Sequence, residues 1–263
     1  MVSAAEHESG PWKSEEPALI SVIVPVYNEE GTVLELLHEV LVAPIGRNHL
    51  EVVVVDDGST DATPELLRQV RDPRVKVVRH ERNRGKGAAV RTGLQHATGD
   101  VILIQDADLE YSPRDYPTLL SPILEGKADV VFGSRFVGHA PHRVLYFWHY
   151  VGNKLVTLLS NAFTNLNLTD VETGFKVFRA DVLRRVQIEE NGFGFEPEIT
   201  AKIAQLDCRL YEVGISYWGR KYAEGKKIRW TDGLRAVYVI LKYAVKGWFR
   251  KLRRRTGDGA GLT

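Results

Sequence analysis

The chain has 263 residues, 44% of them hydrophobic, and a formal net charge of +1 at pH 7. This length and apolar content allow one sizeable core, so we expect a single α/β domain with a short appendage rather than two full domains. Cys208 is the only cysteine, which excludes an intramolecular disulfide and a thiolate zinc site and fits a cytoplasmic protein.

The composition changes at both ends of the chain. Residues 1–18 are rich in Glu, Ser, Ala and Pro and lack an apolar core, so we expect a disordered leader rather than a signal peptide. We assign residues 19–218 to a catalytic domain, 219–255 to a basic amphipathic segment and 256–263 to a disordered tail. No apolar run reaches the roughly 20 residues of a membrane-spanning helix, so we expect the protein not to cross a bilayer by itself.

Short apolar runs rich in β-branched residues alternate with helical patterns from residue 19 onward. The predicted strands cover residues 19–25, 50–56, 75–78, 101–105 and 128–133. Apolar residues at helical spacing, or a capping residue, predict helices over residues 32–41, about 60–70, 88–97 and 112–124. Nearly continuous apolar strands that alternate with helices are typical of a doubly wound, mostly parallel sheet with right-handed crossovers.

The order is less regular after residue 133. The expected elements there are a long apolar helix over 144–163, a short strand and turn over 172–179, helices over 181–186 and 195–206, and a last strand over 210–216. We find no internal repeat in this part of the sequence.

Polar residues follow three of the predicted strands. They are Tyr27-Asn28-Glu29-Glu30 after the first, Asp56-Asp57-Gly58-Ser59 after the second, and Asp106-Ala107-Asp108-Leu109-Glu110 after the fourth. In an open parallel sheet, ligands bind beyond the carboxyl ends of the strands, near the point where the strand order reverses. We therefore expect these segments to converge on one site.

Asp106 and Asp108 place two carboxylates on one side of an extended segment, because side chains alternate along a strand. Such oxygen ligands suit Mg²⁺ or Mn²⁺, with diphosphate oxygens and water completing the shell, and Glu110 continues the alternation as a further ligand. The alternative is an acidic loop that caps the helix near Ser112.

Asp56 and Asp57 end an apolar strand, where carboxylates can accept hydrogen bonds from a ribose or a base, although the segment also fits a plain strand-to-helix turn. The loop around Lys86 leads into a helix whose amino end favours phosphate. It matches neither the GxxxxGK[ST] phosphate loop nor the GxGxxG dinucleotide fingerprint, so it indicates phosphate binding only together with the other segments.

Five segments occur in a fixed order along the chain. They are Val24-Pro25-Val26-Tyr27-Asn28-Glu29-Glu30, Val55-Asp56-Asp57-Gly58-Ser59-Thr60-Asp61, Asn83-Arg84-Gly85-Lys86-Gly87, Asp106-Ala107-Asp108-Leu109 and Gly133-Ser134-Arg135. Their order and spacing resemble the family 2 glycosyltransferases of the GT-A fold over about residues 19–218. The Asp170…Thr173-Gly174-Phe175-Lys176 segment is similar to an element of the dolichol-phosphate mannose and glucose synthases and their bacterial polyprenyl-phosphate relatives.

The resemblance implies a role for each segment. The nucleoside would be held by Pro25, Tyr27, Glu29 and Asp57, and the rest of the nucleotide would be supported by Asp56 and Lys86. The metal and the diphosphate would be bound by Asp106, Ala107, Asp108 and Glu110. The mannose synthases commonly have Gln at the position of Glu110, and the Glu in this chain keeps a ligand oxygen.

The implied reaction is an inverting, metal-dependent transfer of a hexose from GDP-mannose or UDP-glucose to a polyprenyl or dolichyl phosphate. A lipid phosphate is already ionised at neutral pH, so it needs cations rather than a base, and the candidates are Arg135, Arg143 and Lys176. The alternative is a family 2 enzyme that acts on a hydroxyl group of a soluble glycan or natural product. It would need a base, for which the candidates are Asp170, Glu172, Glu196 and Glu198.

The C-terminal segment is strongly basic, with thirteen Lys or Arg against two acids between Arg220 and Arg255. From Trp230 to Trp248, apolar and aromatic residues alternate with basic ones, so we expect a helix that lies on an anionic membrane at its cytoplasmic face, although such a stripe also fits packing on the domain. A noncatalytic nucleotide- or nucleic-acid-binding module is a more remote alternative. We expect no nucleic acid partner, because the folded part is acidic overall.

Overall fold

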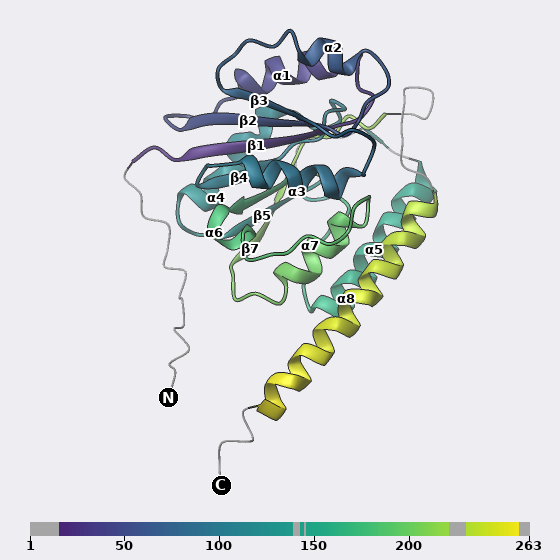
Figure 1. Ribbon diagram of the computed structural model, residues 1–263. Helices are drawn as coiled ribbons and strands as arrows, with labels where there is room; N and C mark the ends of the chain where they lie inside the picture. Colours follow the sequence, from purple (N-terminus) through teal and green to yellow (C-terminus); the bar gives the residue numbers. More distant parts are fainter. Residues whose placement is uncertain (1–15, 139–142, 145, 221–229, 258–263) are drawn as a thin grey trace.

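The computed structural model describes residues 16–138, 143–144, 146–220 and 230–257 (Figure 1). A seven-stranded sheet forms the centre, in the order β3-β2-β1-β4-β6-β5-β7. Its strands are β1 (Leu19–Val26), β2 (His49–Asp56), β3 (Val75–Arg79), β4 (Val101–Ile104), β5 (Val130–Ser134), β6 (Lys176–Arg179) and β7 (Leu210–Gly214). Only β6 runs antiparallel to its neighbours, so the predicted mostly parallel sheet is confirmed for this part of the chain.

The helices lie close to their predicted positions. They are α1 (Val33–Leu41), α2 (Thr63–Leu67), α3 (Lys86–His96), α4 (Tyr116–Leu124), α5 (Phe147–Thr164), α6 (Ala180–Leu183), α7 (Phe195–Ile203) and α8 (Trp230–Gly257). The predicted start at Ser112 is a 3₁₀ turn, Pro113–Asp115, in which Ser112 Oγ accepts the Arg114 N–H at 3.3 Å before α4 begins. The helix near residue 60 is shorter than expected, and Asp61 Oδ1 accepts the Thr63 N–H at its start.

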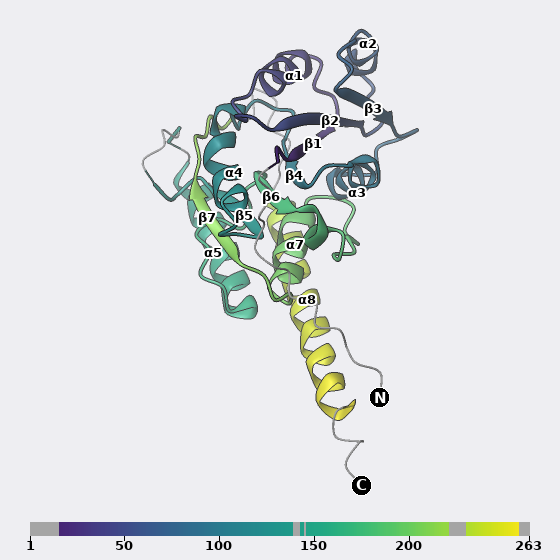
Figure 2. The same ribbon diagram turned by 90° about the vertical axis from the view of Figure 1, so that its left-hand side faces the viewer.

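Helices cover both faces of the sheet, as Figure 2 shows. On one face, α1 and α4 pack their buried Val and Leu side chains on β1, β2 and β4 in the first core. On the other face, α3, α6 and α7 form a second core with Phe132, Phe178 and Phe195. Burial on both faces explains why the strands are apolar throughout.

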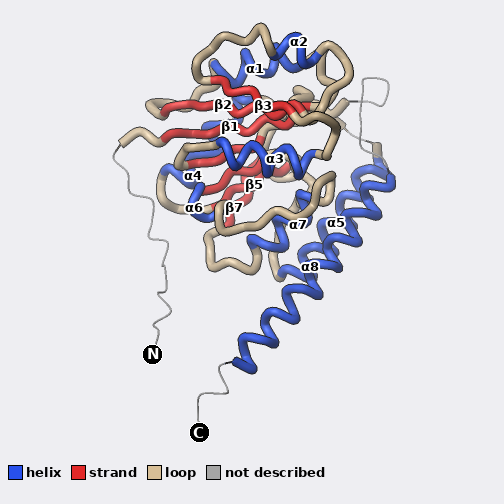
Figure 3. The backbone as a smooth tube through the Cα atoms, in the orientation of Figure 1, coloured by secondary structure: helices blue, strands red, loops and turns tan. Residues whose placement is uncertain are grey.

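Helices α5 and α8 lie side by side outside the sheet (Figures 1 and 3). Val156 of α5 packs against Ala236 and Ile240 of α8, and Val239 and Tyr243 of α8 pack against Ala201 of α7. No helix in the described ranges combines the length and the apolar character that a bilayer crossing requires.

Some sequence predictions fall on parts of the chain that the structure does not describe. They are the leader up to residue 15, residues 221–229 of the basic segment and the tail from residue 258. The side chains of the basic cluster Arg250–Arg255 are also outside the description, although the backbone there belongs to α8.

Candidate active site

The three polar segments meet at the carboxyl ends of β2, β1 and β4, which are neighbours in the sheet. Asn28 N donates to Ser59 Oγ at 2.9 Å, which joins the first segment to the second. Thr32 Oγ1 donates to the Ala107 carbonyl at 2.8 Å, which joins the first segment to the third. The structure therefore brings together the residues that the sequence placed at one site.

Asp57 holds the loop that leads to Lys86. Its carboxylate, 3% exposed, lies 2.6 Å from His80 Nδ1, and it accepts the Arg84 N–H at 3.0 Å and the Gly85 N–H at 2.7 Å. Gly58 closes the turn with a φ of 73°, and a Cβ there would lie 2.4 Å from the Arg82 backbone, so only glycine fits. The structure gives Asp57 a backbone-shaping role, and its predicted nucleoside contact stays a prediction.

One oxygen of Asp56 has an ion-pair partner but no hydrogen bond among the described residues. Its Oδ1 accepts the Ser59 N–H at 2.9 Å. Its Oδ2 is buried and lies 3.0 Å from Arg79 Nε, but it has no hydrogen-bond partner among the described residues. Buried acceptors are normally paired, so this oxygen is suited to a ligand hydroxyl or N–H group.

Lys86 is the first residue of α3 and joins two acidic side chains. Its Nζ lies 2.6 Å from Asp106 Oδ1 and 2.7 Å from Glu196 Oε1. Burial lowers the pKa of Lys86, but the charges of Asp106 and Glu196 outweigh burial and raise the pKa overall. A permanent positive charge therefore lies at a helix amino end, next to the Asp106-Ala107-Asp108 segment.

Asp108 lies in a concentration of negative charge. Burial and the neighbouring carboxylates of Asp106 and Glu110 together raise its pKa to about 7, against the opposing charge of Arg220. A divalent cation would relieve this repulsion, so the oxygen donors fit Mg²⁺ or Mn²⁺. Among the described residues, no three acidic, His or Cys side chains form a complete metal cage.

Glu110 is less available than Asp108. Its Oε2 accepts the Tyr217 hydroxyl at 2.8 Å and its Oε1 accepts the Arg220 N–H at 2.7 Å. Glu110 thus ties the segment after β7 to the segment after β4. Its predicted role as a metal ligand stays a prediction.

Arg220 belongs to the site, although the sequence analysis counted it only in the basic tail. Its Nη2 lies 3.1 Å from Glu29 Oε1 and 3.4 Å from Asp108 Oδ2. The available signal was its position, four residues after the predicted last strand, since the ends of neighbouring strands gather at one edge.

The three predicted acceptor cations have different surroundings. Arg135 is 9% exposed and donates two hydrogen bonds to Asp170, from Nε to Oδ2 at 2.6 Å and from Nη2 to Oδ1 at 2.7 Å. Arg143 is partly exposed, and its Nη1 donates to the Gly219 carbonyl at 2.8 Å. Acceptor contacts by Arg135 and Arg143 stay predictions.

The prediction for Lys176 is wrong. Its side chain has no exposed surface, and its Nζ donates to the Val171 carbonyl at 3.1 Å and to the Thr173 carbonyl at 2.5 Å. Burial lowers the pKa of Lys176, which is about 8, and its ammonium is already bonded to two backbone carbonyls. Lys176 is the first residue of the apolar strand β6, and its sequence position suggested a cation available to an acceptor. The sequence does not show that its ammonium group donates to carbonyls of the preceding turn.

Three of the four predicted base candidates are held by cations. Asp170 pairs with Arg135, Glu196 pairs with Lys86, and Glu198 lies 2.7 Å from Lys202 Nζ. In the fourth, Glu172, the buried Oε1 has no hydrogen-bond partner among the described residues.

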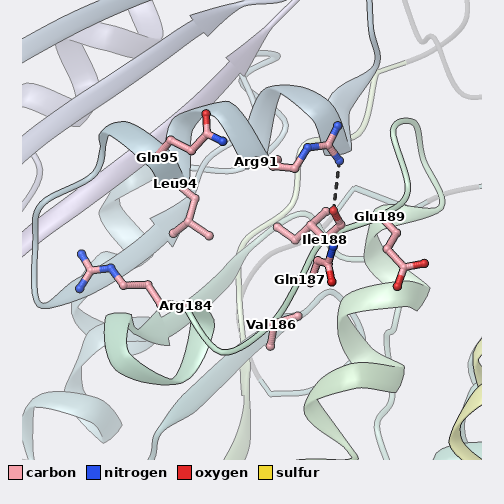
Figure 4. A pocket seen from close by; sticks show the side chains of 8 residues that line it. All are labelled: Arg91, Leu94, Gln95, Arg184, Val186, Gln187, Ile188 and Glu189. Atoms are coloured by element: carbon pink, nitrogen blue, oxygen red, sulfur yellow. Dashed lines mark hydrogen bonds between the residues drawn. The ribbon is translucent and has the colours of Figure 1, made fainter.

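A hollow on the surface lies between α3 and the segment before α7 (Figure 4). Arg91, Leu94 and Gln95 of α3 line one side, and the segment from Arg184 to Glu189 lines the other. Arg91 Nη1 donates to the Ile188 carbonyl at 3.2 Å across it. None of the predicted site residues lines this hollow.

A mostly parallel sheet with an Asp-x-Asp segment at its carboxyl edge defines a GT-A type of domain, and a solved structure supports that fold. Glucosyl-3-phosphoglycerate synthase from Mycobacterium tuberculosis, solved with Mn²⁺, UDP and phosphoglyceric acid, superposes with a TM-score of 0.66 at 21% identity, over 86% of this chain and 78% of that one. Residues 21–187 match the family described as glycosyl transferase family 2, and the chain belongs to that family.

Two curated relatives have similar sequences. The undecaprenyl-phosphate mannosyltransferase of Micrococcus luteus is 32% identical over 256 residues, which cover 90% of this chain and 99% of the relative. The dolichol-phosphate mannosyltransferase of Pyrococcus furiosus is 31% identical over 229 residues, or 85% of this chain. The chain spans 64% of the Pyrococcus protein, less than two thirds of its length.

Proposed function

We propose that the chain transfers a hexose from a nucleoside-diphosphate sugar to a polyprenyl phosphate, with inversion and with Mg²⁺ or Mn²⁺. The observation that carries this proposal is the grouping of Asp106 and Asp108 with two cations, Lys86 and Arg220, at the carboxyl edge of the sheet. The carboxylates suit a divalent cation and the two cations suit a diphosphate. The names of the Micrococcus and Pyrococcus relatives support the acceptor and favour mannose as the sugar.

On the donor side, Lys86 presents a fixed positive charge at the amino end of α3, where a phosphate is favoured. The buried Oδ2 of Asp56 accepts a hydroxyl or N–H group of the nucleoside. Pro25 and Tyr27 are partly exposed at the end of β1 and complete the nucleoside contact.

Asp106 and Asp108 would hold the metal, because they lie where the negative charge is concentrated. Both oxygens of Glu110 are bonded within the protein, and Asp106 would share its oxygens between the metal and Lys86 Nζ. When bound, the metal would stabilise the charge that develops on the departing nucleoside diphosphate. Arg220 lies beside Asp108 and adds a second positive charge for the same group.

On the acceptor side, a phosphate attacks without losing a proton, so no general base is required. This agrees with the pairing of Asp170 and Glu196 with cations, since a paired carboxylate is a weak base. Arg143, partly exposed next to Gly219, contacts the acceptor phosphate.

A membrane-borne acceptor also agrees with the exposed faces of α5 and α8. Helix α5 exposes large apolar side chains at Trp148, Leu155, Leu158 and Phe163, and helix α8 does so at Leu234, Tyr238, Leu241 and Val245. On α8, the cations Arg235, Lys242 and Lys246 bind Glu189 and Glu190 of the domain instead. The apolar stripes of both helices therefore enter the membrane surface, and these three cations anchor α8 to the domain.

The catalytic proposal is tested by donor binding and transfer. A thermal-shift panel of UDP- and GDP-sugars with and without Mn²⁺ identifies the donor, because a ligand of the folded state raises Tm. Transfer of that hexose to undecaprenyl phosphate is then compared with transfer to phosphoglycerate and to free sugars. Transfer only to a soluble acceptor would overturn the lipid-phosphate proposal.

The membrane proposal is tested by co-sedimentation with anionic vesicles. Trp148→Ser should weaken binding about tenfold, because a large apolar side chain contributes about 1.5–3 kcal/mol when buried. Val42→Ser, on an exposed apolar residue just after α1, is the matched control and should bind like the wild type. Equal binding of both variants would contradict the proposed contact.

A further inference from the structure

The turn between α5 and β6 lies directly against Asp106. Gly174 in this turn has no side chain, and a Cβ there would lie 2.0 Å from Asp106 Oδ2 and 3.2 Å from Tyr111 Cε2. Gly174 N donates to the Tyr111 hydroxyl at 3.2 Å, and Lys176 Nζ donates to the Thr173 carbonyl. The turn is therefore fixed next to the segment proposed to bind the metal and the diphosphate.

Two adjacent side chains of this turn carry polar atoms to which no described residue is hydrogen-bonded. Glu172 Oε1 and Thr173 Oγ1 are both buried and have no hydrogen-bond partner among the described residues. Thr173 as a whole has no exposed surface. Buried polar atoms without partners destabilise a fold, so two of them in neighbouring residues indicate a ligand.

The charges around the turn select a neutral, hydroxyl-bearing ligand. Burial and the nearby carboxylate of Glu196 together raise the pKa of Glu172 to about 7. The cations packed against the turn are already bonded, since Arg135 pairs with Asp170 and Lys176 donates to the carbonyls of Val171 and Thr173. A phosphate would be repelled, whereas a hydroxyl group can donate to a carboxyl oxygen and accept from a threonine hydroxyl.

We propose that Glu172 Oε1 and Thr173 Oγ1 bind hydroxyl groups of the donor's hexose and so determine how tightly the sugar is held. This inference rests on the proposed function, because the hexose is the hydroxyl-rich group attached to the diphosphate beside Asp106. Gly174 lets the turn approach the Asp106 carboxylate closely, because a side chain at this position would push that carboxylate away.

The test compares a nucleoside diphosphate with its sugar-bearing form. In Thr173→Val and Glu172→Gln, the Kd for the nucleoside diphosphate alone should stay within about twofold of the wild type, measured by calorimetry with Mn²⁺. The Kd for the nucleotide sugar should rise roughly tenfold, because a contact made only with the sugar is lost. Glu125→Gln, an exposed carboxylate at the end of α4, is the control and should change neither value.

Thermal unfolding provides a second measurement, because a purely structural role of Thr173 would make Tm fall in Thr173→Val. Thr173→Val should keep or raise Tm, because it removes a buried hydroxyl that has no partner. A lower Tm would show that the hydroxyl is satisfied within the protein and would overturn its assignment. Unchanged nucleotide-sugar affinity in both variants, with nucleoside diphosphate binding intact, would overturn the inference alone. Absence of nucleotide binding by the wild type would overturn the proposed function together with it.

Discussion

Two acidic residues at neighbouring strand ends, Asp57 after β2 and Asp108 after β4, have opposite surroundings. Asp57 accepts hydrogen bonds from the backbone of Arg84 and Gly85 and from His80. Asp108 lies near two further carboxylates, and its pKa is raised to about 7 by burial and by their charge. A carboxylate satisfied by backbone N–H groups shapes a loop, whereas a carboxylate held among like charges gains most from an incoming cation.

Asp108→Asn should have the largest effect. The change removes a carboxylate proposed to bind the metal, so kcat for hexose transfer should fall on the order of 10²–10³-fold. The fold should persist, because a repulsive charge is removed. Transfer of a labelled hexose at saturating Mn²⁺ measures the loss. Glu125→Gln should transfer normally, and near-normal transfer by Asp108→Asn would contradict the proposed difference between the two residues.

Asp57→Ala should act on stability first. It leaves the N–H groups of Arg84 and Gly85 without their acceptor, which should cost about 1–3 kcal/mol in the free energy of unfolding. Urea unfolding followed by circular dichroism gives this value. Asp72→Ala, which removes a carboxylate paired with Arg74 on an exposed loop, should have a smaller effect. Equal losses in the two variants would mean that Asp57 does not organise the loop.

Arg220→Gln should weaken donor binding several-fold, roughly 1 kcal/mol, by removing a positive charge from the carboxylates and the diphosphate. The Kd of the nucleoside diphosphate with Mn²⁺ reports the change. Arg68→Gln, on an exposed ion pair with Glu65, is the matched control. An unchanged Kd in Arg220→Gln would restrict Arg220 to pairing with Glu29.

The last expected effect is in the pH dependence of stability. An unfolded Asp titrates near 3.8 and folded Asp108 near 7, so the folded protein binds the additional proton between these values. The stability that this group contributes is complete below pH 3.8 and is lost as the pH rises through 7. Urea unfolding across this range should show a shallower fall in Asp108→Asn. Identical slopes would contradict the raised pKa.

The sequence predicted the central strands well because β1, β2 and β4 are continuous apolar runs, and burial on both faces requires such runs. It did not predict that β6 runs antiparallel, since four residues that begin with Lys176 carry no signal of direction. It placed Asp56, Asp57, Asp106 and Asp108 at one edge because parallel strands share their carboxyl ends.

The bonding partners of the site residues were harder to predict than the positions of these residues in the fold. Which oxygen of Asp56 is left over, and whether Lys176 faces solvent or a turn, depend on backbone groups from distant parts of the chain. Arg220 reaches Glu29 across 191 positions, a contact that composition assigned instead to a basic tail.

The anchoring of α8 has a consequence for how the site is positioned. The three cations of α8 bind Glu189 and Glu190, and the next carbonyl along the chain, that of Asn191, accepts the Ala88 N–H at 3.1 Å in the first turn of α3. That first turn begins with Lys86. A stretch of three residues thus links the outer helix to the start of α3, so a tilt of that helix would be passed on through three ion pairs and one backbone hydrogen bond to the ammonium group beside Asp106.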